Sequence, residues 1–124
     1  MAGYVVQLEE KTLKNEYFRE VLFTTTKSQL VVMALQPGED IGSEVHPEHD
    51  QFIRVEQGIG KAVMNGVESA LSDGTAVVIP AGTEHNIINT GTTVMKLYTV
   101  YTPPEHADKT IHATKAEALA AHHT

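Results

Sequence analysis

Short apolar runs separated by turn residues fill most of the chain, and this pattern is typical of β-strands. The run from residue 94 to residue 101 presents two distinct faces, because successive side chains of a strand point to opposite sides. Asn65-Gly66 lies between two such runs and predicts a tight hairpin, since both turn positions need positive φ. The strands are expected at residues 17–26, 30–35, 51–56, 61–64, 67–71, 75–79, 85–89 and 94–101. Their spacing of roughly 8–12 residues favours an all-β sandwich or barrel.

The character of the sequence changes after residue 104, where two prolines end the last expected strand. Residues 114–121 are rich in alanine and predict one short helix. Thr114 is a suitable N-cap, and Glu117 stands three residues later, as a capping box requires. For a chain of 124 residues we expect a single domain over residues 1–124, with a barrel core at about 30–103 and a tail with a helix at 104–124.

The charge balance of the chain argues against two classes of partner. It carries 9 basic and 16 acidic residues, a formal net charge of -7, and its lysines are scattered rather than clustered. Affinity for nucleic acid rests on clustered Lys and Arg, and an acidic surface also disfavours anionic membranes. The absence of cysteine excludes disulfides and thiolate metal sites, and it fits a cytoplasmic protein. No signal peptide is indicated, and no apolar run approaches the roughly 20 residues that span a bilayer.

Two polar segments contain the candidate chemistry. Glu44 and His46 lie two residues apart, so they share one face if residues 41–46 are extended. Gln51 follows on the next expected strand, and His85 begins a later one after a Pro-Ala-Gly turn. If these strands line one barrel, the four side chains converge inside it. Imidazole nitrogens together with a carboxylate and an amide oxygen suit zinc or another first-row divalent metal ion.

The second polar segment resembles the second motif of the cupin superfamily, G-x5-P-x-G-x2-H-x3-N. Its fixed positions are filled by Gly74, Pro80, Gly82, His85 and Asn89. The first motif of that family, G-x5-H-x-H-x3-4-E-x6-G, is matched in its glycine spacing and in its second histidine, His46. Glu44 stands at the position of the first histidine and Gln51 at the position of the glutamate. Residues 50–58 also resemble small bacterial cupins that are called sugar-phosphate isomerase-like.

This resemblance spans roughly residues 30–103 and implies a jelly-roll barrel, or double-stranded β-helix, that holds one divalent metal ion. The implied ligands are Glu44, His46, Gln51 and His85, and the implied metal is Mn, Fe, Ni, Co, Cu or Zn. His49 has no position in the motif and is the alternative ligand in place of Glu44 or Gln51. Considered by itself, His49 is expected to be a solvated loop residue.

The residues leave three kinds of function open. In the first, a metal ion and Glu44 as general base carry out isomerase- or lyase-type proton transfer on a small polar molecule, and a metal-dependent dioxygenase is the rival within this class. In the second, the protein binds a sugar or another small molecule without turnover. In the third, the barrel is metal-free and its polar residues hold water.

Two further expectations concern residues outside the motifs. His106 and His112 lie in the tail and are expected at the surface, although they could cover the barrel mouth. Strand edges at residues 4–8 and 17–26 could pair with a second copy of the chain, so we expect a homodimer.

Overall fold

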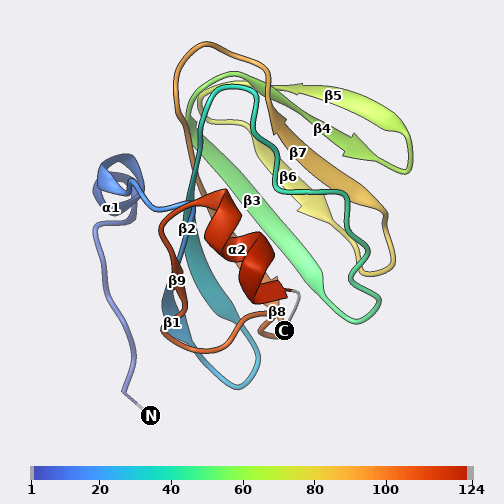
Figure 1. The fold of residues 1–124 in the computed structure, drawn as a ribbon. Coiled ribbons are helices and arrows are strands. Elements are labelled where there is room, and N and C mark those ends of the chain that lie inside the picture. The colour runs from blue at the N-terminus through green and yellow to red at the C-terminus, as the bar shows by residue number, and fades with distance from the viewer. Residues whose placement is uncertain (1, 123–124) are drawn as a thin grey trace.

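The chain folds into two antiparallel sheets arranged as a jelly roll (Figure 1). The computed structural model describes residues 2–122. One sheet has six strands in the order β6-β3-β8-β2-β1-β9, and the other has three in the order β5-β4-β7. The strands are β1 (Arg19–Thr24), β2 (Gln29–Leu35), β3 (Asp50–Gln57), β4 (Gly60–Met64), β5 (Val67–Leu71), β6 (Ala76–Ile79), β7 (His85–Asn89), β8 (Met95–Thr102) and β9 (Ile111–His112). The helices are α1 (Leu8–Lys14) and α2 (Lys115–His122).

Every strand that the pattern predicts is present, with bounds shifted by no more than two residues. The hairpin is confirmed, since Asn65 has φ 48° and Gly66 has φ 82°. The predicted helix is also confirmed, and its capping box is formed in both directions. The Glu117 N–H donates to Thr114 Oγ1 at 3.2 Å, and the Thr114 N–H donates to Glu117 Oε2 at 3.0 Å. Strand β9 escapes prediction because two residues are too few to show an alternating pattern.

The interior of the barrel changes from apolar to polar along the strands. Inward side chains toward one end are apolar and fully buried, among them Met33, Leu35, Val55, Met95 and Leu97. Toward the other end the same strands bury polar side chains, with Gln29 on β2, Gln51 on β3 and Tyr101 on β8. Tyr101 pairs in register with both glutamines, so the three lie at one level. We call this polar end the barrel mouth.

Helix α1 covers the outer face of the larger sheet, where it packs on β2, β3 and β8. It buries Thr12, and it leaves strand β2 buried on both faces. Val32 and Ala34, which alternate with the inward residues of β2, are 0% and 2% exposed. This double burial explains why β2 is an unbroken apolar run in the sequence rather than an alternating one.

The strand edge expected at residues 4–8 is wrong, because residues 4–7 are not in a strand and Leu8 begins helix α1. The helix has acidic residues in its first turn and basic residues in its last, which complement the helix dipole. Lys14 and Glu10, four residues apart, form an ion pair at 2.6 Å. Such local charge pairing favours a helix even though the segment is short.

The homodimer stays a prediction. Strand β9 pairs with β1 at Arg19 and Glu20, and the Val21 N–H donates to the Thr110 carbonyl at 2.9 Å. Among the described residues, positions 22–24 of β1 therefore keep an outer edge without a strand partner, which is the part of the expected edge that remains available.

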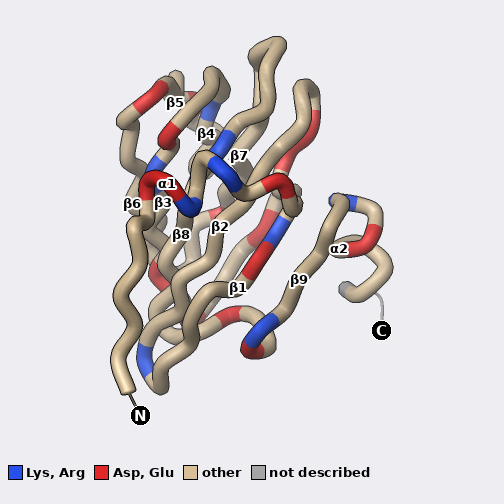
Figure 2. Tube along the Cα trace, turned by 90° about the vertical axis from the view of Figure 1, so that its left-hand side faces the viewer, with Lys and Arg blue, Asp and Glu red and all other residues tan. Residues whose placement is uncertain are grey.

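Charge and hydropathy along the described chain agree with the sequence pattern. Figure 2 shows basic positions scattered among acidic ones, with no continuous basic stripe. Neither helix within residues 2–122 has the length and apolar character needed to cross a bilayer.

Gly60, at the start of β4, occupies a position where no side chain fits. A Cβ there would lie 2.3 Å from the Ile88 carbonyl oxygen and 2.3 Å from Met95 Cε. Because the carbonyl belongs to the neighbouring strand β7, relief requires a backbone shift. We expect Gly60→Ala to lower the free energy of unfolding by about 2 kcal/mol, measured by chemical denaturation. Gly3→Ala is the control, since nothing lies within 4 Å of its added Cβ, and an equal loss in both variants would contradict the expectation.

Candidate metal centre

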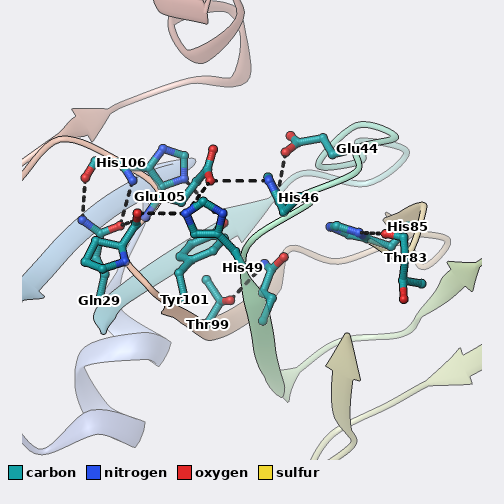
Figure 3. A network of polar contacts seen from close by, with 12 residues as sticks. Gln29, Glu44, His46, His49, Thr83, His85, Thr99, Tyr101, Glu105 and His106 are labelled. Atoms are coloured by element: carbon teal, nitrogen blue, oxygen red, sulfur yellow. Dashed lines mark hydrogen bonds and ion pairs between the residues drawn. The ribbon is translucent and has the colours of Figure 1, made fainter. Parts of the chain in front are cut away.

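The barrel mouth gathers the predicted site residues around His46 (Figure 3). His46, Gln51 and His85 are 8%, 3% and 5% exposed, so all three are buried polar groups. Burial of a polar group is costly unless the group has a partner, so the partners of these side chains indicate what the site can bind.

Backbone hydrogen bonds bring Glu44 and His85 side by side. The Glu44 N–H donates to the His85 carbonyl at 2.9 Å, and the His85 N–H donates back to the Glu44 carbonyl at 2.9 Å. The Gly82 N–H donates to the His46 carbonyl at 2.9 Å, which continues the connection two residues further on. Residues 44–46 therefore lie extended beside the start of β7 and the turn before it, and Glu44 and His46 share one face as their two-residue spacing predicts.

His46 contacts a carboxylate with each ring nitrogen. Its Nε2 lies 2.9 Å from Glu44 Oε2, and its Nδ1 lies 3.5 Å from Glu105 Oε2. The hydrogen bond to Glu44 raises the pKa of His46, outweighing the burial that lowers it. Burial raises the pKa of Glu44, but the hydrogen bond and charge of His46, with the charge of Arg19, leave it below its usual value. The two side chains are therefore a mutually stabilised acid–base pair.

His85 is held in the tautomer that a metal ligand needs. Its Nδ1 lies 2.9 Å from the Thr83 carbonyl oxygen, which can only accept a hydrogen bond. Nδ1 therefore carries the proton, and Nε2 keeps its lone pair. Figure 3 shows the ring extending toward His46 and Glu44, and the ring centroids of His46 and His85 lie 5.2 Å apart. A backbone carbonyl bonded to the second ring nitrogen is the usual arrangement for a metal-bound histidine.

Gln51 has one amide atom paired and the other unpaired. Its Nε2 donates to Thr99 Oγ1 at 3.0 Å, while its buried Oε1 has no hydrogen-bond partner among residues 2–122. A buried oxygen without a partner is uncommon and indicates a bound cation, donor or water at that place. The amide oxygen of Gln51 thus fits the role of a neutral metal ligand.

We call the four predicted ligands, Glu44, His46, Gln51 and His85, the inner set, and their atom types suit a divalent metal ion. Ligand atoms at about 2.1 Å from a common ion lie about 3 Å apart when they are neighbours in the coordination shell. The 2.9 Å between His46 Nε2 and Glu44 Oε2 agrees with this spacing, and a bound ion would replace the proton that joins the two atoms here. Ligation by the inner set itself stays a prediction.

A second group of potential ligands shares His46, and we call His46, His49 and Glu105 the outer set. One ligand atom from each of the three lies within 4.8 Å of the others. His49 is half-buried rather than solvated as expected. Its Nε2 lies 3.0 Å from the Pro104 carbonyl oxygen, so this nitrogen carries a proton and has no free lone pair for a metal ion. The free lone pair of His49 lies on Nδ1, which is buried and has no partner among the described residues.

Gln29 holds the tail over the barrel mouth. Its Oε1 accepts from the backbone N–H of Glu105 at 3.2 Å and from that of His106 at 2.9 Å. Its Nε2 donates to the His106 carbonyl at 2.7 Å. Gln29 is 1% exposed, so these bonds form away from water, where a lost partner is expensive. Glu105 and Gln29 both escape prediction, because neither lies in a motif and their proximity arises only from the fold.

A cavity of about 450 Å³ opens beside Glu44, the member of the inner set that lines it. Glu44 and Glu105 line it together with residues of β1, β9 and α2. His106 and His112 also line it and are half-buried, rather than lying free at the surface as expected. Burial lowers the pKa of His106 to about 3, and burial and the charge of Arg19 lower the pKa of His112, so both rings are neutral near pH 7.

Gln29→Ala tests whether this glutamine positions the tail. The variant leaves the N–H groups of Glu105 and His106 unpaired, so we expect it to lower the free energy of unfolding by about 2–3 kcal/mol. We also expect amide hydrogen exchange at Glu105 and His106 to become faster than elsewhere in the barrel. Gln57→Ala is the control, because its exposed amide makes one long contact, at 3.5 Å. Unchanged exchange at both tail positions in Gln29→Ala would contradict the positioning role.

Two relatives match most of the chain. "Uncharacterized protein YrkC" of Bacillus subtilis (strain 168) is 47% identical over 124 residues, which cover 95% of this chain and 67% of that protein. "Uncharacterized protein L612" of Acanthamoeba polyphaga mimivirus is 48% identical over 107 residues, which cover 83% of this chain and 67% of that protein. The chain thus spans about two thirds of the length of each.

The fold is also that of several solved structures. The crystal structure of BH2720 from Bacillus halodurans superposes with a TM-score of 0.94 at 44% identity, over 96% of this chain and 95% of that one. The structure of KdgF from Halomonas sp. superposes with a TM-score of 0.65 at 24% identity, over 70% of this chain and 78% of that one, which is a likeness in fold. Residues 31–101 match the family model described as "Cupin domain".

Proposed function

Because the chain belongs to the cupin family, we propose that it is a metal-dependent enzyme that acts on a small polar molecule by isomerase- or lyase-type proton transfer. The observation that carries this proposal is the inner set, three members of which are buried while the fourth, Glu44, lines the cavity. It offers a histidine Nε2 with a free lone pair, an amide oxygen without a partner, and a carboxylate bonded to a second histidine. The volume of about 450 Å³ suits a small molecule rather than a polymer.

The inner set is the proposed holder of one divalent ion, which is Mn, Fe, Ni, Co, Cu or Zn. When bound, such an ion supplies a Lewis acid for a substrate carbonyl. We favour the inner set over the outer set because two of its members, His85 and Gln51, hold a free acceptor atom. His85 gives its proton-bearing Nδ1 to a backbone carbonyl and keeps Nε2 free, and Gln51 Oε1 is a buried acceptor without a partner among the described residues, while the free lone pair of His49 lies on Nδ1 and makes the outer set the alternative.

Glu44 is the proposed general base. Its side chain is 37% exposed and lines the cavity, so a bound molecule can reach it, while His46 holds its Oε2 at 2.9 Å. In this role the carboxylate takes a proton from a carbon next to a carbonyl and returns it to a neighbouring atom. His106 meets Tyr101 edge-on, with ring centroids 5.2 Å apart, and lines the same cavity as Glu44.

Metal content of single variants tests the proposed ligands. Protein purified without chelator and equilibrated with each of the six metals is expected to hold about one ion per chain, by elemental analysis. His46→Ala and His85→Ala are expected to weaken binding at least ~100-fold, because each removes a ligand. His49→Ala is the matched control and should keep the ion. Loss of the ion in His49→Ala with retention in His85→Ala would assign the outer set instead, and no uptake by the wild-type protein would overturn the metal-dependent function.

Glu44→Gln tests the base. The amide keeps an oxygen for the ion and cannot accept the proton, so we expect metal to be retained while solvent deuterium exchange into short α-hydroxy ketones falls at least ~100-fold. Dihydroxyacetone is the first probe compound, and its deuterium exchange is measured by NMR. Glu48→Gln, which changes an exposed carboxylate nearby, is the control. Oxygen uptake with these compounds would indicate a dioxygenase, and binding without exchange or uptake would indicate a non-catalytic binding protein.

A further inference from the structure

The cavity has a cationic wall that the proposed metal centre does not use. We propose that this wall, centred on Arg19, binds an anionic oxygen group of the substrate, a carboxylate or a phosphate. The role of that molecule as substrate rests on the function proposed above. The substrate class is then a small carbonyl compound with an acidic group at one end.

Arg19 is buried although it carries a charge. It is the first residue of β1 and is 7% exposed. It pairs in register with Met33 and stands two residues before Val21, and both of these belong to the apolar core. Its side chain therefore lies on the inner face of the sheet, where it lines the cavity. Arginine stays protonated in proteins, so the positive charge is taken into the interior.

The guanidinium group has too few partners for its charge. No carboxylate of the described residues forms an ion pair with it. Its Nε is buried and lacks a hydrogen-bond partner within residues 2–122. One terminal nitrogen lies 3.2 Å from His112 Nδ1, and the group lies 5.3 Å from the centre of the Phe18 ring. An unpaired buried charge is costly, so a ligand that brings an anion here would relieve that cost.

His112 supplies a second donor beside Arg19. Since the arginine can only donate, His112 Nδ1 accepts, and the proton of the neutral ring lies on Nε2. His112 also lines the cavity, as does Lys115, whose amine pairs with Asp40. The planar guanidinium with a neighbouring N–H matches the oxygens of a carboxylate or phosphate.

Glu44 lines the same cavity as Arg19 and feels its charge. A molecule whose acidic group lies at Arg19 would therefore keep its other end within the space that the proposed base faces. Fixing one end of the molecule in this way orients the carbon that loses a proton, which is how a charged anchor assists proton transfer.

The experiment uses the fact that the chain has two arginines, Arg19 and Arg54. Arg54 is at the surface and pairs with Glu56, so Arg54→Gln leaves one arginine Nε–H signal, from Arg19, without altering the cavity. Metal-free Arg54→Gln protein is titrated with acetate and with inorganic phosphate at constant ionic strength. We expect the Arg19 signal to shift and saturate with one or both anions, and the anion that saturates identifies the group. Acetamide, the neutral analogue of acetate, should leave the signal unchanged.

Arg19→Gln provides the second arm. The readout in this variant is the His112 ring signals. We expect the anion that saturates the Arg19 signal to bind at least ~10-fold more weakly to Arg19→Gln than to Arg54→Gln, which loses the same charge. Metal content should be equal in the two variants. No saturable response to either anion, or an equal response to acetamide, would overturn the inference. Because this readout needs no metal ion, failure of the anion site and failure of the metal centre are distinguished.

Discussion

The site depends on two hydrogen bonds exchanged between the backbones of Glu44 and His85. They join the segment before β3 to strand β7 of the smaller sheet, so two motif segments that lie far apart in the chain become neighbours. Because side chains alternate along extended backbone, this single pairing also decides which residues turn inward. His46 is thereby brought against Glu44, and its ring stands close to that of His85.

Some buried polar groups of the barrel have hydrogen-bond partners and others do not, and the two kinds lie in different parts of the barrel. Asn89, in the interior away from the mouth, donates to the carbonyls of Leu35 and Thr93 and accepts from the Gly91 N–H. Three buried side-chain atoms without a partner occur in the described part of the chain: Arg19 Nε, His49 Nδ1 and Gln51 Oε1. All three belong to residues of the mouth or the cavity wall. Their concentration there indicates groups kept for a ligand rather than defects of packing.

Much of the fold and part of the site can be predicted from the sequence, because local spacing determines both. Alternation, turn residues and the capping box act within a few residues, so the strands and helix α2 are predictable. The positions of His46 and His85 follow from motif spacing alone. Helix α1 is not predictable in the same way, since it has only seven residues and depends on packing against the sheet.

The remaining site residues are set by contacts between segments distant in the chain. Glu105 reaches His46 only because Gln29 fixes the tail, and the two ends of that clamp are separated by most of the barrel sequence. Arg19 likewise meets His112 through the pairing of β1 with a two-residue strand. Glu105 and Arg19 belong to no periodic pattern and to no motif, so the sequence alone does not predict them as site residues.

The Gln29 amide bonds Glu105 and His106 through their main-chain atoms rather than their side chains. The path of the tail is thus independent of which side chains those two positions carry. Either residue can be exchanged for any residue but proline without loss of these hydrogen bonds. Ligand preference at this wall is consequently free to diverge between related proteins while the scaffold beneath it stays the same.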